Sequence, residues 1–177
     1  MPSTSDPTEP SPTETNQFDT IIATADGARG ELRLNRPDKL NPLSSHTLHE
    51  IELAARWFDE HHDLKVVVVS GAGRAFSAGA DLSAFSTAAP MEDRQVGWRM
   101  ARALDEMRAV TVARIQGWCV GGGLVVAAGG GLAIAAGTAR VPGPGGDHGL
   151  PLAWGGIPPT GRARLSQTPE PAHERTR

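Results

Sequence analysis

Residues 113–128, ARIQGWCVGGGLVVAA, constrain the fold of this chain more than any other stretch. A short apolar run is followed by Gly117, by the triplet Gly121, Gly122 and Gly123, and then by a second apolar run. The pattern predicts a strand that leads through a glycine turn into a buried helix. Because the first N–H groups of a helix have no partner within it, such a turn suits a phosphate, a carboxylate or a developing oxyanion. Tight packing of strand against helix explains the triplet equally well.

Length and charge exclude several classes of protein. The chain has 177 residues, enough for one domain with a core, and its net charge of −3 argues against a nucleic-acid-binding protein. Cys119 is the only cysteine, so we expect a buried thiol and no intrachain disulfide. No apolar run reaches membrane-spanning length and the N-terminus lacks signal-peptide features. We therefore expect no membrane partner and a cytoplasmic location.

The N-terminal half predicts a tail, a hairpin and a helix. Residues 1–17 are rich in Pro, Ser and Thr and predict a disordered tail. Residues 18–24 and 29–34 are β-prone runs on either side of an Asp-Gly pair, which favours a hairpin turn. Apolar residues then recur at helical spacing from Ser45 to about Glu60.

The second half alternates strands, glycine-bearing loops and helices. Residues 64–69, LKVVVV, predict a strand covered on both faces, as in a parallel sheet. A glycine-rich loop leads to an expected helix start near Leu82, and a second amphipathic helix is expected over roughly residues 92–108. Strands are expected at 111–115 and 132–136. This alternation indicates an α/β protein.

Three familiar glycine motifs are absent. Neither glycine loop has the third glycine of the dinucleotide fingerprint, because Phe76 and Val126 occupy that position. No Gly-Lys-Ser/Thr sequence marks a P-loop, and Ala75 breaks the nucleophile-elbow pattern.

Three blocks of the sequence resemble the crotonase, or enoyl-CoA hydratase/isomerase, family. They are NRPDKLN at 35–41, VVVSGAGRAFSAGADL at 67–82, and ARIQG with the glycine triplet at 113–123. The resemblance covers a core at residues 18–141. It implies a crotonase-like spiral of repeated ββα units, an acyl-CoA thioester substrate, and assembly into trimers or hexamers.

The resemblance also assigns a site. The backbone N–H groups of Ala80 and Gly122 match the two donors that polarise the thioester carbonyl in this family. The positions that match the CoA and substrate site are Lys39, Leu40, Ala78, Gly79, Ala80, Asp81 and Leu82. CoA is then part of the substrate, and we expect neither a separate cofactor nor a metal.

Two departures from the family affect the expected chemistry. Hydratases of the family use two glutamates, and the matching positions here are Val125 and Gly145. Neither side chain can move a proton, so hydration has no visible acid–base carrier. Asp81, Asp147 and His148 are the nearby alternatives, and we expect Asp81 to cap its helix. Whether the chain is an enzyme therefore stays open.

The sequence changes character from residue 142. Half of the fourteen prolines lie from there on, and no apolar period follows residue 159. We expect residues 142–177 to be degenerate and poorly ordered, and the C-terminal helices that complete the family's acyl pocket and trimer to be missing. A truncated acyl-CoA-binding protein of fatty-acid metabolism is the leading interpretation. A non-catalytic interaction subunit and a truncated pseudogene product are the alternatives.

Overall fold

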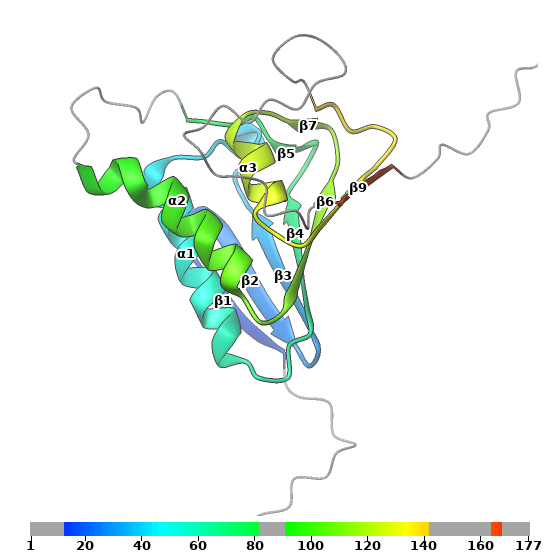
Figure 1. Ribbon diagram of the computed structural model, residues 1–177. Coiled ribbons are helices and arrows are strands. Elements are labelled where there is room, and N and C mark those ends of the chain that lie inside the picture. The colour runs from blue at the N-terminus through cyan, green and yellow to red at the C-terminus, as the bar shows by residue number, and fades with distance from the viewer. Residues whose placement is uncertain (1–12, 82–90, 142–163, 168–177) are drawn as a thin grey trace, which may run out of the picture.

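A seven-stranded sheet forms the centre of the molecule (Figure 1), a computed structural model that describes residues 13–81, 91–141 and 164–167. In chain order the elements are β1 (Glu14–Gln17), β2 (Ile21–Asp26), β3 (Arg29–Leu34), the 3-10 helix η1 (Pro37–Lys39), α1 (Ser45–Glu60), β4 (Val66–Gly71), β5 (Ala75–Ser77), α2 (Met91–Glu106), β6 (Val110–Ile115), β7 (Trp118–Cys119), α3 (Gly122–Ala128), β8 (Leu132–Ala135) and β9 (Arg164–Gln167). The large sheet has the order β1-β2-β3-β4-β6-β8-β9, and β5 and β7 form a separate two-stranded sheet.

The first three strands are antiparallel and the rest of the large sheet is parallel. β2 and β3 form the expected hairpin, in which Gly27 takes a positive φ of 52°. From β3 onward each neighbour runs parallel, through β4, β6 and β8 to β9. Each parallel step needs a crossover connection, and α1, α2 and α3 lie in the crossovers between these strands. The predicted α/β architecture is confirmed.

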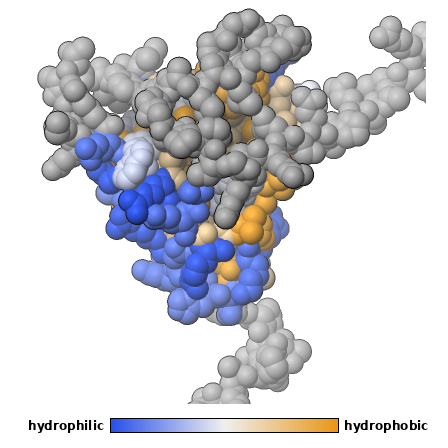
Figure 2. All heavy atoms as spheres, viewed as in Figure 1, coloured by the Kyte–Doolittle hydropathy of each residue, from blue (hydrophilic) through white to orange (hydrophobic). Residues whose placement is uncertain are grey.

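The helices α1 and α2 pack together on one face of the sheet (Figure 1). Ser44 caps α1 by accepting a hydrogen bond from the Thr47 N–H at 3.2 Å. Helical spacing carries Ile51 and Phe58 to the inner side of α1, where both are buried. Figure 2 shows hydrophilic residues over the outward side of the two helices. The main core thus lies between this helical layer and the sheet.

Among the described residues, the opposite face of the sheet is less covered at β4. Val67 and Val69 of β4 point into the core, whereas Val66 and Val68, on the other face, are partly exposed. The expectation that this strand is covered on both faces was wrong. Among the described residues, both long helices lie on the same side, so the valines at alternate positions have no helical layer above them.

Two short strands correct the predicted ends of the core. Glu14–Gln17 were expected in a disordered tail but form β1, which pairs with β2. Arg164–Gln167 were expected in a poorly ordered segment but form β9, which pairs with β8. An edge strand is held by backbone hydrogen bonds and needs no apolar side chains, so composition did not reveal either strand. Residues 1–12, 142–163 and 168–177 of these two predicted segments, and the helix start expected near Leu82, lie outside the described residues.

No helix within the described residues is both long enough and apolar enough to span a membrane.

Candidate functional site

The two segments that the sequence assigns to substrate binding lie side by side. Leu43 donates its N–H to the Gly79 carbonyl at 2.8 Å, and Asp81 donates its N–H to the Leu43 carbonyl at 2.9 Å. The Ala78 N–H donates to the Leu40 carbonyl at 2.8 Å. The chain that follows η1 therefore forms a short parallel bridge with residues 78–81.

This bridge fixes the direction of the Ala80 N–H. The carbonyl of the Gly79–Ala80 peptide accepts the hydrogen bond from Leu43. Because the C=O and N–H of a trans peptide point in opposite directions, the Ala80 N–H points away from Leu43. Within the described part of the chain, this N–H donates no hydrogen bond. Among the described residues it is thus a backbone donor without an acceptor.

The second predicted donor lies at the start of α3, next to the same loop. Gly122 is the first residue of α3, after Gly121 with its positive φ of 50°. Gly123 and Leu124 donate their N–H groups to Val120 and Gly121, but the Gly122 N–H donates to no other described residue. A Cβ at Gly122 would lie 3.2 Å from Leu43 Cδ1, so this donor also borders the bridge.

Gly79 brings the loop and the helix start into contact. It has a positive φ of 86°, and an added Cβ would lie 2.7 Å from the Val120 carbonyl oxygen and 3.7 Å from the Gly122 nitrogen. Only glycine combines this backbone conformation with this approach. The sequence predicted both glycine loops, and the tertiary structure brings them together.

The Asn41 side chain connects the segment around η1 to residues 72–75, a role that the sequence pattern did not indicate. It is buried and takes a positive φ of 53°, a conformation that Asn tolerates better than most residues. Its Nδ2 donates to the carbonyls of Ala72 and Ala75 at 2.9 Å, and its Oδ1 accepts from the Arg36 N–H at 2.9 Å. The NRPDKLN block is therefore tied to the chain between β4 and β5.

Asp81 forms an ion pair. Its carboxylate lies 3.1 Å from the Arg36 guanidinium, and both side chains are largely buried. The helix that Asp81 was expected to cap lies outside the described residues. The pair joins η1 to the end of the 78–81 loop.

The remaining predicted positions differ in their surroundings. Lys39 is exposed at the end of η1 and Leu40 is partly buried. Val125 lies on α3, partly buried against the core, where the family resemblance implies a glutamate. Leu82, Gly145, Asp147 and His148 lie outside the described residues.

Cys119 is a buried structural thiol. It has no exposed surface, and burial raises its pKa to about 12. A thiol that stays protonated at neutral pH is a poor nucleophile. The expectation of a small buried hydrophobe is confirmed.

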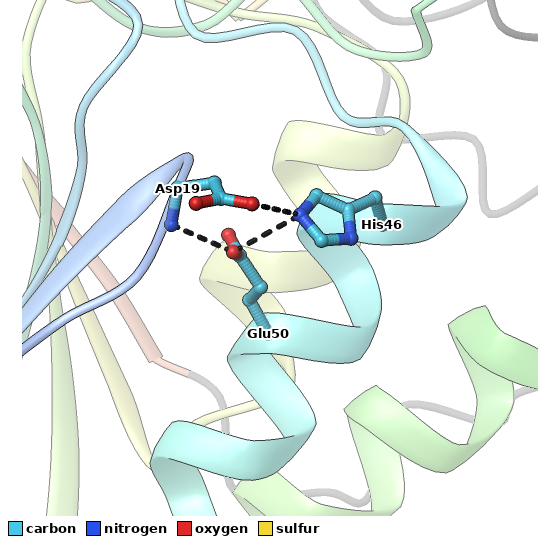
Figure 3. A group of neighbouring side chains, drawn as sticks. All are labelled: Asp19, His46 and Glu50. Atoms are coloured by element: carbon cyan, nitrogen blue, oxygen red, sulfur yellow. Dashed lines mark hydrogen bonds and ion pairs between the residues drawn. The ribbon is translucent and has the colours of Figure 1, made fainter.

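Asp19, His46 and Glu50 form the one group of possible metal ligands within the described residues (Figure 3). The His46 Nε2 lies 3.1 Å from Asp19 and 3.2 Å from Glu50. The buried Glu50 carboxylate already accepts the N–H groups of Asp19 and Thr20, at 2.8 and 3.0 Å, and the Thr20 hydroxyl. Its oxygens thus join the start of β2 to α1, which explains the group without a metal.

The fold is of the mixed α/β class, and its two glycine loops meet at the start of the short helix α3. Comparisons with known proteins give the family. Residues 26–159 match the family described as Enoyl-CoA hydratase/isomerase. The chain is 32% identical over 152 residues to a probable enoyl-CoA hydratase of Mycobacterium bovis, covering 78% of this chain and 58% of that protein. It is 28% identical to the short-chain-enoyl-CoA hydratase of Clostridium acetobutylicum, covering 79% of this chain and 55% of that protein.

Solved structures agree with the sequence comparison. A crystal structure of an enoyl-CoA hydratase/carnithine racemase from Magnetospirillum magneticum has a TM-score of 0.65 and 29% identity, and covers 71% of this chain and 49% of that chain. The chain belongs to the enoyl-CoA hydratase/isomerase family and has the crotonase fold. It spans less than two thirds of the length of these relatives. The family match extends past residue 141, where the sequence analysis placed the end of the recognisable core.

Proposed function

We propose that this chain binds acyl-CoA thioesters and polarises the thioester carbonyl with the N–H groups of Ala80 and Gly122. The observation that carries the proposal is the contact of Gly79 with Val120 and Gly122, which brings two available backbone donors to one place. The substrate class follows from family membership and from relatives named as enoyl-CoA hydratases.

These donors would act on charge that develops at the thioester oxygen. When a thioester is converted to an enolate, negative charge gathers on that oxygen, and fixed N–H groups stabilise it without reorganisation. One such donor is worth roughly 3–4 kcal/mol in other enzymes. Lys39, exposed at the end of η1, would supply a positive charge for the phosphates of CoA.

We infer that this chain has no hydratase activity. Val125 and Gly145 stand where the family resemblance implies the two glutamates, and neither can transfer a proton. The proposed role is therefore thioester binding and activation within acyl-CoA or fatty-acid metabolism. The single buried thiol of Cys119 is compatible with a reducing compartment such as the cytoplasm.

Two variants of Gly122 test the proposal. Gly122 is the first residue of α3, a position that accepts proline without loss of a helical hydrogen bond. Gly122→Pro removes the N–H, whereas Gly122→Ala retains it and adds the same Cβ next to Leu43. We expect calorimetric titration with an acyl-CoA to show binding by the wild-type chain and Gly122→Ala, and up to about 10-fold weaker binding by Gly122→Pro, which loses one hydrogen bond to the thioester carbonyl.

The outcomes of this titration are distinct. Equal affinities of the alanine and proline variants would exclude the Gly122 N–H as a donor, and no binding by the wild-type chain would exclude the function. Crotonyl-CoA hydration is measured in parallel. Hydration at rates usual for enzymes would contradict the inference that the chain lacks the acid–base residues for this reaction.

A second candidate function is that of an interaction subunit without catalysis. It is favoured by the sheet face away from α1 and α2, where Val110 is 57% exposed and Ile134 is 38% exposed. On this face Val66 and Val68 pair in register with Val110 and Val112, and a contiguous apolar patch of this kind favours contact with another protein. The molar mass in solution distinguishes the candidates, because a monomer that binds acyl-CoA supports the first and an oligomer that does not bind it supports the second.

A further inference from the structure

Ser77, the last residue of β5, contacts both halves of the proposed site. Its side chain has no exposed surface. The Ser77 hydroxyl donates to the Asn41 carbonyl at 2.8 Å and accepts the Gly79 N–H at 3.1 Å. Gly79 directly precedes Ala80, so this hydroxyl fixes the peptide next to the first proposed donor.

The rest of Ser77 contacts the second half of the site. Its carbonyl accepts the Val120 N–H at 3.1 Å. A Cβ at Gly123 would lie only 2.9 Å from the Cβ of Ser77, so the helix start lies directly against this residue. Val120 and Gly123 flank the glycines that include the second proposed donor, Gly122.

We propose that Ser77 is a positioning residue that sets the distance and orientation between the Ala80 and Gly122 N–H groups. The inference rests on the proposed function. Two hydrogen bonds hold the backbone on either side of the Gly79 Cα. Ser77 accepts the N–H of the Ala78–Gly79 peptide, and Leu43 donates to the carbonyl of the Gly79–Ala80 peptide. With the hydroxyl removed, the Gly79 N–H loses its acceptor, whereas the hydrogen bonds of Ala78 with Leu40 and of Leu43 with Gly79 and Asp81 remain. The backbone at Gly79 can then rotate between these fixed points, which misaligns the Ala80 N–H.

A control variant at another buried serine distinguishes a positioning role of Ser77 from a purely structural one. Ser70 supplies the matched control, because it is equally buried and its hydroxyl donates to Glu31 at the same distance of 2.8 Å. Ser70 lies in β4, and its hydroxyl is bonded to Glu31 of β3 rather than to residues 78–81 or the start of α3. Each alanine variant loses the hydrogen bond donated by a buried hydroxyl, and only Ser77→Ala also leaves the Gly79 N–H without its acceptor beside the donors.

The test is the infrared stretching frequency of the thioester carbonyl in a bound acyl-CoA carrying ¹³C at that carbon. Polarisation by aligned donors lowers this frequency. We expect the full decrease in the wild-type chain and Ser70→Ala, and a smaller decrease with roughly 3-fold weaker binding in Ser77→Ala, because a misaligned hydrogen bond keeps part of its free energy. Amide hydrogen exchange at Gly79, measured without ligand, should be faster in Ser77→Ala only.

Ser77→Cys gives a second, more conservative variant if Ser77→Ala does not fold. Its thiol is a weaker donor and acceptor, so we expect a decrease in carbonyl frequency between those of the wild type and Ser77→Ala. An undiminished decrease in both variants would overturn this inference and leave the proposed function intact. No decrease in the wild-type chain would overturn the proposed function, and this inference with it.

Discussion

Gly79 lies against Val120 so closely that a Cβ at position 79 would come within 2.7 Å of the Val120 carbonyl oxygen. The contact joins two glycine loops that are separated in the sequence by α2 and β6. It also sets how near the Ala80 N–H comes to the start of α3. The distance between the two loops is therefore the feature on which the proposed site depends most.

Gly79→Ala should separate the two loops. The methyl group meets a backbone oxygen, and alanine is strained at a φ of 86°, so we expect a loss of about 1–3 kcal/mol in the free energy of unfolding and loss of acyl-CoA binding. Gly27→Ala is the control, because Gly27 has a positive φ of 52° but nothing within 4 Å of an added Cβ. Urea unfolding and calorimetric titration measure both effects. Unchanged binding in Gly79→Ala would contradict the proposed contact.

The Asn41 side chain should contribute more to stability than a surface side chain. Asn41→Ala leaves buried carbonyls without a donor, which costs about 1–3 kcal/mol. Asn41→Gly removes the same hydrogen bonds but relieves the strain of a positive φ, so we expect it to be about 1 kcal/mol more stable than the alanine variant. Urea unfolding of the two variants measures this difference. Equal stabilities would indicate that the backbone changes conformation when the side chain is lost.

The Arg36–Asp81 pair should be worth more than an exposed ion pair. Its side chains are 24% and 12% exposed, against 56% and 60% for Arg102 and Glu106. A double-mutant cycle with Arg36→Gln and Asp81→Asn should give a coupling free energy above ~1 kcal/mol, and the Arg102–Glu106 cycle less than ~0.5 kcal/mol. The same coupling in both cycles would show that burial does not strengthen the first pair.

Glu52 should make stability depend on pH. Burial raises its pKa, but hydrogen bonds and charge from Arg99, together with Arg56 and His49, outweigh burial and lower the pKa below its ordinary value of 4.5. A carboxyl whose pKa is lower in the folded chain stabilises the fold above its unfolded pKa, and this contribution is lost as the pH falls through the folded pKa. We expect Glu52→Gln to weaken the fall in stability below about pH 5. Urea unfolding of both proteins between pH 7 and pH 3 measures it, and parallel curves would contradict the assignment.

Glu50 should act as a structural acceptor. Glu50→Ala leaves the N–H groups of Asp19 and Thr20 without their acceptor, so we expect a loss of about 2–3 kcal/mol in unfolding free energy. Added Zn²⁺ should not raise the melting temperature of the wild-type chain, because the Glu50 oxygens already accept these hydrogen bonds. A concentration-dependent rise that His46→Ala abolishes would instead identify a metal site.

Local patterns in the sequence predict most elements of the core. The Asp-Gly hairpin, α1 from Ser45 to Glu60, and the strand–glycine–helix order at α3 depend on neighbours within a few residues, so they can be read directly from the chain. The short edge strands β1 and β9 escaped prediction because backbone pairing with a neighbouring strand holds them. Likewise, the uncovered face of β4 depends on where the helices pack, and a run of valines does not encode that.

The sequence by itself determined which residues belong to the candidate site, since the glycine loops and the family resemblance name Ala80 and Gly122. Only the tertiary structure decided how those residues are held. The contacts of Ser77 with Asn41, Gly79 and Val120, and the pairing of Arg36 with Asp81, join segments that are distant along the chain. Hydrogen bonds of this kind depend on positions in space, which sequence spacing does not specify. The orientation of the two N–H groups is therefore a property of the folded chain.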